Sequence, residues 1–394
     1  MIRRTFLQTG LAAGTVGFMA GIQNADANTE VKSHVNVSEI LPGTPIPTDG
    51  KPFQKIKIAQ FGVRHEHASG KMNTLRMLPD LFEIVGIAAE SPEEEAKHKN
   101  DGVYRGLKWY SKEELLNLPG LEAAAVETEM TELLPTAIKC AERGLHMHVD
   151  KPLGQDLEEC RKMLEACRTN NVIMQPGYMF RTNQAFRLLL KAVKKGWLGE
   201  IHDVALDMCR NDVSPGFRKW LATYRGGGMY DFGSHLIDYV VELLGMPKEI
   251  HVFEKPDPND GLSDNTLSVM LYEKAIAEIR VSLRKIDGFA RRRLAAHGTK
   301  GSFTVDPIEA WWHDPATKKL PPLNVRLTLA EDNEEFPKGT HELKLEPYSD
   351  RYIGQLTDFA YYIRGLKENP YTLDYELEVQ KVILAASGYI KWVG

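Results

Sequence analysis

The strongest constraint on the fold is a regular alternation of strand-like and helix-like segments between residues 55 and 180. Short apolar runs typical of buried strands are KIKIAQFG, FEIVGIAAE, AAAVET and LHMHVD, and segments with helical spacing of apolar residues separate them. Alternating strands and helices with short connections predict a parallel sheet covered by helices on both faces. We therefore expect residues 55–180 to form a doubly wound Rossmann domain.

A different pattern begins at residue 181. One helical segment, AFRLLLKAVKKG, precedes longer strand-rich runs such as IHDVALDMCR, NTLSVMLYE and AIAEIRVSLRK. Alternating polarity in these runs indicates a sheet with one covered face and one open face. The expected fold class is α/β, in which the Rossmann domain is followed at 181–394 by a second α/β domain with a large, open, mainly antiparallel sheet.

Composition argues against one class of partner. The chain has 394 residues, of which 43% are hydrophobic and 26% charged, and its formal net charge is −5. These values are ordinary for a soluble enzyme, and the negative charge gives no general attraction to nucleic-acid phosphates. We interpret the one dense basic spot, Arg291 to Arg293, as a solvated loop or strand edge. A small molecule is the expected partner.

The N-terminus carries the pattern of an export signal. Arginines at positions 3 and 4, followed by Phe6 and Leu7, open an apolar stretch that ends in an Ala-x-Ala sequence at Ala27. This pattern resembles a twin-arginine signal peptide at 1–27, which predicts an exported, periplasmic protein. Its run of about 15 apolar residues is shorter than the ~20 that span a bilayer. A buried N-terminal helix is the alternative.

The first strand-to-helix connection, GVRHEHASG, is the expected site for the pyrophosphate of a dinucleotide. Gly62 fills the first position of a GxGxxG motif, in which backbone amides at a helix N-terminus face the phosphates. Arg64 and His67 replace the second and third glycines, and the charge of Arg64 offers compensation. An ordinary loop without a dinucleotide is the alternative. The cofactor-binding residues expected here are Gly62, Val63, Arg64, His65 and His67.

Glu90 is the expected partner of the adenosine ribose. It ends the second strand, where a carboxylate hydrogen-bonds the ribose hydroxyls and favours NAD over NADP. Its separation of 28 residues from Gly62 is longer than usual, and a surface glutamate is the alternative.

The triplet His65-Glu66-His67 contains residue types that commonly bind zinc. Adjacent loop residues need further ligands to hold one ion, and none stands at a suitable spacing in the sequence. No metal site is therefore predicted.

Lys151 is a candidate catalytic residue. It lies in LHMHVDKPLG, where Pro152 disfavours helical geometry, so the lysine belongs at the carboxyl end of a strand. Ligands of doubly wound sheets bind at that edge. An ammonium there can hydrogen-bond a substrate hydroxyl, and desolvation is expected to lower the pKa of Lys151 toward the working range. A surface lysine before a turn is the alternative.

A second candidate group lies in RGGGMYDFGSHLIDYVVELLG. Asp231, His235 and Asp238 stand at i, i+4 and i+7, on one face of a predicted helix. Histidine is suited to taking a hydroxyl proton near neutral pH, and a carboxylate one turn earlier can orient it or bind a second hydroxyl. The alternatives are a helix-start aspartate and a core histidine.

Taken in order, these segments resemble the Gfo/Idh/MocA family of glucose-fructose oxidoreductases and inositol dehydrogenases, from about Lys55 to the C-terminus. DKP at 150–152 is close to the family's Glu-Lys-Pro, and GGGMYDFGSH at 226–235 is close to its GGGxxxDxGxH. The resemblance implies a nicotinamide cofactor in the first domain and a sugar or polyol between the domains. It also implies a homo-oligomer, dimer or tetramer, held through the C-terminal sheet.

The resemblance assigns roles to individual residues. Lys151, Asp231 and His235 would be the catalytic group, with His235 as the acid or base. Thr128, with Lys151, would contact the cofactor, although VETEMTEL at 126–133 departs from the family's Thr-Pro-Asn-x-x-His. The substrate contacts it implies are Tyr178 and Arg181, from the GYMFR match, together with Asp231 and His235.

The expected activity is hydride transfer between a hydroxyl of a sugar, glycoside or cyclitol and a tightly bound NAD or NADP, with NAD favoured. Two alternatives stay open, a redox-neutral glycoside hydrolase or lyase and a non-catalytic sugar-binding protein. The proline-rich arm at 28–54 is expected to be extended, either across a neighbouring subunit or as a spacer. Trp311, Trp312 and His313 either stack on a sugar or belong to a core or interface.

Overall fold

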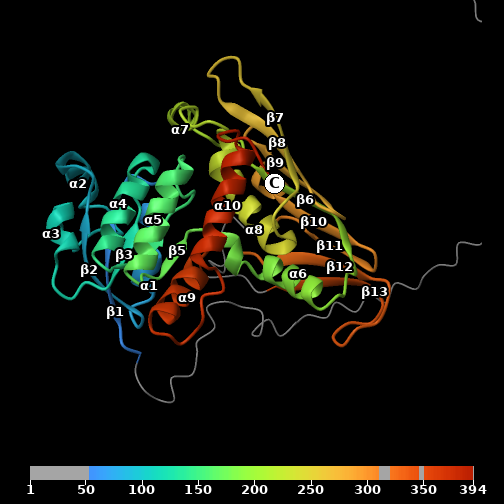
Figure 1. Cartoon of the computed structure of the whole chain (residues 1–394), viewed down its shortest axis with the longest axis horizontal. Coiled ribbons are helices and arrows are strands. Elements are labelled where there is room, and N and C mark those ends of the chain that lie inside the picture. The colour runs from blue at the N-terminus through green and yellow to red at the C-terminus, as the bar shows by residue number, and fades with distance from the viewer. Residues whose placement is uncertain (1–52, 310–319, 346–349, 394) are drawn as a thin grey trace, which may run out of the picture. The chain divides into compact units, whose positions relative to one another are not determined.

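A five-stranded parallel sheet forms the first domain of this computed structural model, which describes residues 53–309, 320–345 and 350–393. The strand order is β2-β1-β3-β4-β5, and all neighbouring strands run parallel. The strands are β1 (Ile56–Phe61), β2 (Phe82–Ala88), β3 (Ala123–Val126), β4 (His146–Val149) and β5 (Met174–Pro176). The predicted Rossmann-type sheet is confirmed (Figure 1).

Helices cover both faces of this sheet. They are α1 (Ala68–Met77), α2 (Pro92–His98), α3 (Lys112–Leu116), α4 (Met130–Glu142) and α5 (Leu157–Thr169). Side chains alternate along β1, so Ala59 and Phe61 join the core beneath α4 and α5, while Ile56 and Ile58 join Leu75 of α1 on the other face. Because neither face is open to water, the strands are continuous apolar runs in the sequence.

Several helices of this domain begin at side chains that cap the free backbone amides. Ser91, Ser111 and Asp156 each accept a hydrogen bond from the amide three residues further on, at the starts of α2, α3 and α5. Ser111 and Glu114 form a complete capping box. Each cap stabilises its helix by about 1 kcal/mol, so the local sequence helps to set these boundaries.

An eight-stranded sheet forms the second domain, in the order β13-β12-β11-β10-β6-β9-β8-β7. Neighbouring strands are antiparallel except for the parallel pair β6 and β9. The strands are β6 (Ile201–Cys209), β7 (Glu249–Pro256), β8 (Ser263–Leu271), β9 (Ile276–Ser282), β10 (Arg293–Gly298), β11 (Gly301–Val305), β12 (Leu323–Leu329) and β13 (Gly339–Leu345). The predicted large, open, mainly antiparallel sheet is confirmed.

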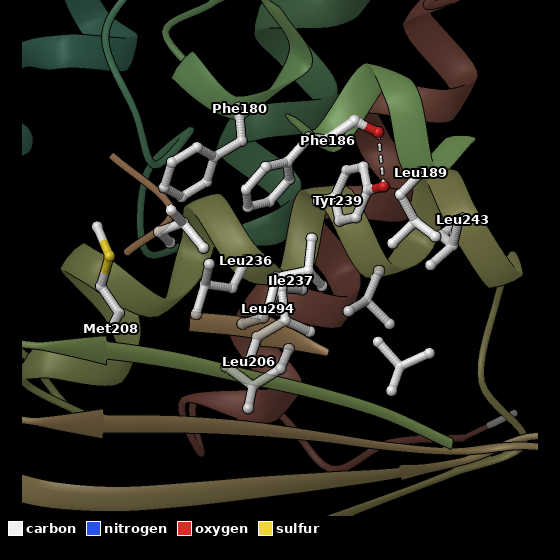
Figure 2. Packing of buried hydrophobic residues seen from close by; sticks show 14 of the residues in the cluster. Phe180, Phe186, Leu189, Leu206, Met208, Leu236, Ile237, Tyr239, Leu243 and Leu294 are labelled. Atoms are coloured by element: carbon white, nitrogen blue, oxygen red, sulfur yellow. Dashed lines mark hydrogen bonds between the residues drawn. The ribbon is translucent and has the colours of Figure 1, made fainter. Parts of the chain in front are cut away.

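A helical layer covers one face of the second sheet. The helices after β5 are α6 (Gln184–Lys194), α7 (Pro215–Leu221), α8 (Ser234–Leu244), α9 (Ile353–Ile363) and α10 (Leu373–Ala386). Phe180 and Phe186 stack with ring centroids 4.3 Å apart, and the Tyr239 hydroxyl of α8 donates to the Phe186 carbonyl at 2.8 Å (Figure 2). Leu206 and Leu294 of the sheet belong to the same core. Burial of each such side chain contributes about 1.5–3 kcal/mol, so this core fixes the position of α8.

The last two helices pack against the first domain. Leu356 and Phe359 of α9 belong to the core that contains Ile56 and Ile58. Helix α10 packs between α5 and α8 (Figure 1). Helix α9, which the sequence division places in the second domain, therefore contributes to the core of the first, whereas Val379 and Ile383 of α10 belong to the core of the second.

Three sequence predictions fall outside the described residues. They are the signal peptide at 1–27, all but the last two residues of the arm at 28–54, and the Trp311, Trp312 and His313 cluster. Within 53–309, 320–345 and 350–393, no helix combines the length and the apolar character that a membrane crossing needs.

Candidate active site

The structure brings Lys151 and Asp231 into direct contact. Lys151 follows β4 at the carboxyl edge of the parallel sheet, and its Nζ donates to Oδ1 of Asp231 at 2.6 Å and to the Asp231 carbonyl oxygen at 3.0 Å. Both side chains are buried. Two motifs that lie 80 residues apart in the chain thus meet at one point.

Asp231 and His235 are held by a short π-helical turn and the first turn of α8. The π turn spans Met229–Gly233, and α8 continues from Ser234. The preceding glycines permit close packing, since a Cβ at Gly226 would lie 2.7 Å from the carbonyl oxygen of Ser387. His235 is buried beside the ring of Phe180, and its Nδ1 has no hydrogen-bond partner among the described residues.

The charges of this group follow from burial and from near neighbours. Burial lowers the pKa of His235, and the cations of Lys151 and His67 lower it further, so its imidazole is neutral and able to accept a proton. Burial alone would lower the pKa of Lys151, but the carboxylates of Asp231 and Asp150 outweigh it and raise that pKa. The expected lowering of the Lys151 pKa is therefore wrong, because a buried acid stands beside the amine.

His65 and His67 converge on the carboxylate of Asp150. His67 Nδ1 lies 3.1 Å from Asp150 Oδ2, and its Nε2 lies 3.4 Å from a Glu66 oxygen. His65 Nδ1 lies 3.3 Å from Asp150 Oδ2. The sequence offered no further potential metal ligand near His65 and His67, but the fold places Asp150, which follows β4, beside both histidines.

Protonation of His67 accounts for this cluster. Burial alone would lower the pKa of His67, but Asp150 and Glu66, one at each ring nitrogen, outweigh burial and raise it. Burial lowers the pKa of His65 to about 4, so its neutral Nδ1 can accept from the His67 amide at 3.3 Å. Asp150 and Glu66 therefore favour the protonated form of His67, and His67 and Lys71 together place positive charge near Asp150.

The turn after β1 has the geometry of an anion-binding turn. Gly62 has φ = +97°, and a Cβ there would lie 2.5 Å from the amide nitrogen of Thr128, so only glycine fits. The amides of Val63 and Arg64 both point at the carboxylate of Glu90, at 3.2–3.3 Å. The turn therefore already presents backbone donors to a negative group.

These residues fit a bound dinucleotide. Glu90 lies beside the turn at the end of β2, as a ribose partner must, and is only partly buried. Arg64 is half-exposed and pairs with Glu129 at 2.7 Å, so its guanidinium stands at the surface of the turn. Thr128 is buried at the end of β3, and its hydroxyl has no partner among the described residues. His67, in the third glycine position, turns toward Asp150 instead of blocking the turn.

Arg181 and Tyr178 lie apart from His235's cavity. Arg181 is buried and donates to both oxygens of Asp238 and both oxygens of Glu376, at 2.6–3.1 Å. Both residues line a different cavity, between β5 and α9, although the edge of the Tyr178 ring contacts His235. The guanidinium of Arg181 is thus occupied by two buried carboxylates and lies outside the cavity that His235 lines, so the substrate contact implied for it stays a prediction.

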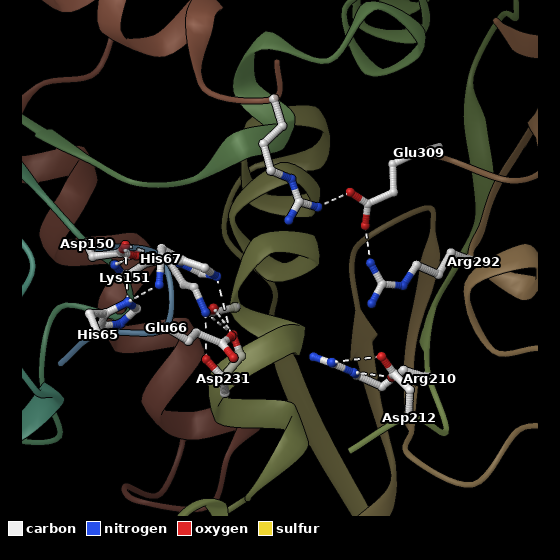
Figure 3. A network of polar contacts seen from close by, with 12 residues as sticks. His65, Glu66, His67, Asp150, Lys151, Arg210, Asp212, Asp231, Arg292 and Glu309 are labelled. Atoms are coloured by element: carbon white, nitrogen blue, oxygen red, sulfur yellow. Dashed lines mark hydrogen bonds and ion pairs between the residues drawn. The ribbon is translucent and has the colours of Figure 1, made fainter. Parts of the chain in front are cut away.

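One cavity is lined by two of the three catalytic candidates, Lys151 and His235, whereas Asp231 is buried behind Lys151 and does not line it. Its wall combines charged and apolar side chains of both domains, namely Glu66, His67, Lys151, Met179, Met208, Arg210, Phe232, His235, Phe289, Arg292 and Arg351. Figure 3 shows Lys151, Asp231 and the two histidines on one side, and Arg210 and Arg292 on the other.

Sequence reasoning missed the arginines of this wall. Arg292 is 2% exposed, so its interpretation as part of a solvated edge is wrong, whereas Arg291 and Arg293 are exposed. The alternation of side chains along a strand could have predicted that Arg292 is buried, because it lies on the same face as the buried Leu294 and Ala296.

Comparison with known proteins agrees with this architecture. Residues 56–178 match the model described as "Oxidoreductase family, NAD-binding Rossmann fold", and residues 186–304 match the "GFO/IDH/MocA C-terminal domain". The aldose-aldose oxidoreductase of Caulobacter crescentus has a similar structure, with a TM-score of 0.69 and 20% identity over 85% of this chain and 98% of that one. At this identity the structural likeness shows the fold.

Two dehydrogenases are similar in sequence. The myo-inositol 2-dehydrogenase of Thermotoga maritima is 25% identical over 72% of this chain and 81% of its own length. The scyllo-inositol 2-dehydrogenase (NADP(+)) IolW of Bacillus subtilis is 29% identical over 35% of this chain, and the match spans only 39% of that protein. The two family models, the fold and these relatives agree, and the chain belongs to the Gfo/Idh/MocA family of oxidoreductases.

Proposed function

We propose that this protein transfers hydride between a CH–OH group of a sugar, glycoside or cyclitol and NAD or NADP. The observation that carries the proposal is a cavity, at the carboxyl edge of the parallel sheet, that is lined by His235 and by Lys151, whose ammonium is paired with Asp231 behind it. Ligands of doubly wound folds bind at this edge. A nicotinamide bound there supplies the hydride acceptor or donor.

The chain's own residues supply alignment and proton transfer. Neutral His235 takes the proton of the substrate hydroxyl, because its side chain lines the cavity and its imidazole is uncharged. The ammonium of Lys151 holds the same oxygen and stabilises negative charge that develops on it. Asp231 keeps Lys151 charged and in place. A positioned base of this kind contributes about 10²–10⁴-fold to the rate.

Nucleotide analysis is the first test. We expect denatured protein to release NAD or NADP, identified by mass spectrometry, and nucleotide-free protein to bind it again. Glu90 favours NAD, so Glu90→Ala should weaken NAD binding more than NADP binding, with exposed Glu83→Ala as the control. Failure to release or bind either nucleotide would favour the non-catalytic sugar-binding reading.

Product analysis separates the two catalytic readings. Net conversion of a hydroxyl to a carbonyl with stoichiometric reduced nicotinamide supports the dehydrogenase. Cleavage of a glycoside without net change in nicotinamide would replace it with the redox-neutral hydrolase or lyase.

We further propose export through the N-terminal signal and oligomer formation through the open face of the second sheet. Phe253 and Ile276 are 59% and 53% exposed on that face. An apolar open face of this kind suits a self-complementary interface. Light scattering should find a dimer or tetramer that Phe253→Asp dissociates, and a wild-type monomer would contradict the proposed interface.

For export, N-terminal sequencing of the protein from the periplasm should find cleavage after Ala27. An uncleaved protein that stays in the cytoplasm would contradict the proposed signal.

A further inference from the structure

Three arginines form the wall of the cavity that faces the catalytic candidates. Arg210 directly follows β6, Arg292 directly precedes β10, and Arg351 lies two residues before α9. All three line the cavity that Lys151 and His235 also line. Three separate segments of the chain thus place guanidinium groups in the cavity that Lys151 and His235 line.

Two of these guanidiniums have donors left over. Arg210 donates through Nε and Nη2 to Asp212, at 2.8 and 3.2 Å, and its Nη1 makes no hydrogen bond to a described residue. Arg292 donates through Nε to the Cys209 carbonyl at 3.0 Å and through Nη1 to Glu309, and its Nη2 likewise has no partner in the described ranges. Each arginine therefore keeps one terminal nitrogen for a ligand.

Both guanidiniums pack against one aromatic ring. The ring of Phe289 packs against both, with its centroid 4.1 Å from Cζ of Arg292 and 5.5 Å from Cζ of Arg210. Figure 3 shows the two side chains pointing into the same space. Glu309 is shared, since Arg351 also contacts it.

The titration of Arg292 is consistent with this geometry. Burial lowers the pKa of Arg292, and the neighbouring charges of Arg351 and Arg210 lower it further, although Glu309 acts in the opposite direction. Like charges held together in a buried wall are unfavourable unless an anion joins them. Arginine pairs are well suited to oxyanions, because the planar guanidinium donates two parallel hydrogen bonds to carboxylate or phosphate.

We infer that the substrate is an anionic sugar or cyclitol, whose carboxylate or phosphate binds Nη1 of Arg210 and Nη2 of Arg292 while a hydroxyl faces His235 and Lys151. This inference rests on the proposed function and narrows its substrate class. The anion anchors one end of the molecule, and the anchor selects which hydroxyl reaches the catalytic group.

Direct binding tests the inference without requiring turnover. The probes are D-glucuronate, D-glucose 6-phosphate and D-glucose, measured by calorimetry on the full-length protein with bound nucleotide. We expect at least one of the two anions to bind 10-fold or more tightly than D-glucose, with affinity that falls as salt rises. Which anion binds distinguishes a sugar acid from a sugar phosphate.

Variants connect that preference to the arginines. Arg210→Gln and Arg292→Gln should each weaken binding of the preferred anion by about 10-fold or more and weaken D-glucose binding by a clearly smaller factor. Exposed Arg291→Gln is the matched control and should bind as the wild type does. Arg210 is the less buried of the two, so Arg210→Gln remains informative if Arg292→Gln fails to fold.

The outcomes separate this inference from the proposed function. Equal affinity for anions and D-glucose, or unchanged anion affinity in a folded Arg210→Gln, overturns the anion site, even if the protein oxidises neutral sugars. Arginine-dependent anion binding by a protein that never exchanges hydride leaves the anion site in place and overturns the dehydrogenase.

Discussion

Replacing Asp231 with asparagine tests the pairing on which the active site depends. The change keeps the size of the side chain and removes its charge, so buried Lys151 retains hydrogen-bond acceptors but loses its nearest counterion, and Asp150 compensates it only in part. At 2.6 Å and an effective dielectric constant of about 20, the lost attraction is about 6 kcal/mol before compensating terms. Loss of one partner from a buried ion pair costs about 3–5 kcal/mol in net stability. We expect Asp231→Asn to lower the free energy of unfolding by that amount.

Urea unfolding followed by circular dichroism measures this loss, and a double-mutant cycle with Lys151→Met isolates the pair. Removing both charges leaves neither one uncompensated, so the double variant should be more stable than the sum of the single losses predicts, by about 2–3 kcal/mol. The effect should persist from pH 6 to 9. Because the pKa of Lys151 is raised, its contribution is complete below its ordinary pKa and is lost only as the pH rises through the folded value. Additive losses, or an Asp231→Asn variant as stable as the wild type, would refute the reasoning.

Three further predictions follow from single residues. His235→Asn should lower kcat by about 10²-fold or more, whereas the control His251→Asn, at an exposed position, should not. The wild-type kcat/KM should not fall between pH 7 and pH 6, because burial lowers the pKa of His235 and keeps its imidazole neutral there. A fall in kcat/KM centred near the ordinary histidine pKa would contradict this. Gly62→Ala should lower the free energy of unfolding by about 3 kcal/mol and weaken nucleotide binding. Gly106 also has a positive φ, but no atom lies near its missing Cβ, so Gly106→Ala should lower the free energy of unfolding by only about 1 kcal/mol. Equal losses in thermal unfolding would contradict the argument that Gly62 is closely packed. Arg181→Met should cost about 3–5 kcal/mol in urea unfolding with an unchanged substrate KM, and a raised KM in a stable variant would show that Arg181 contacts the substrate.

Much of the fold could be predicted because its signals are local. The apolar strands of residues 55–180 alternate with helices over short distances, and each strand is buried on both faces, so periodicity alone indicates the parallel sheet. Lys151 and His235 could also be predicted, because Pro152 restricts the backbone beside Lys151 and the glycine run before Asp231 allows the close approach that a ligand site needs.

The remaining site residues could not be predicted because they depend on long-range contacts. Asp150 completes a cluster with His65 and His67 only when β4 lies beside the first turn. Lys151 has a raised pKa because of Asp231, which no local pattern reveals. The same limitation applies to Arg210, which reaches the cavity only through the order of strands in the second sheet.

The most direct test of the central claim follows nicotinamide absorbance when nucleotide-loaded protein is mixed with anionic and neutral sugars. The account predicts a rapid, substrate-dependent change of one equivalent per active site in the wild type, and its loss in a folded His235→Asn variant that still binds nucleotide. A protein that binds neither NAD nor NADP, or a His235→Asn variant that reacts as fast as the wild type, would contradict it.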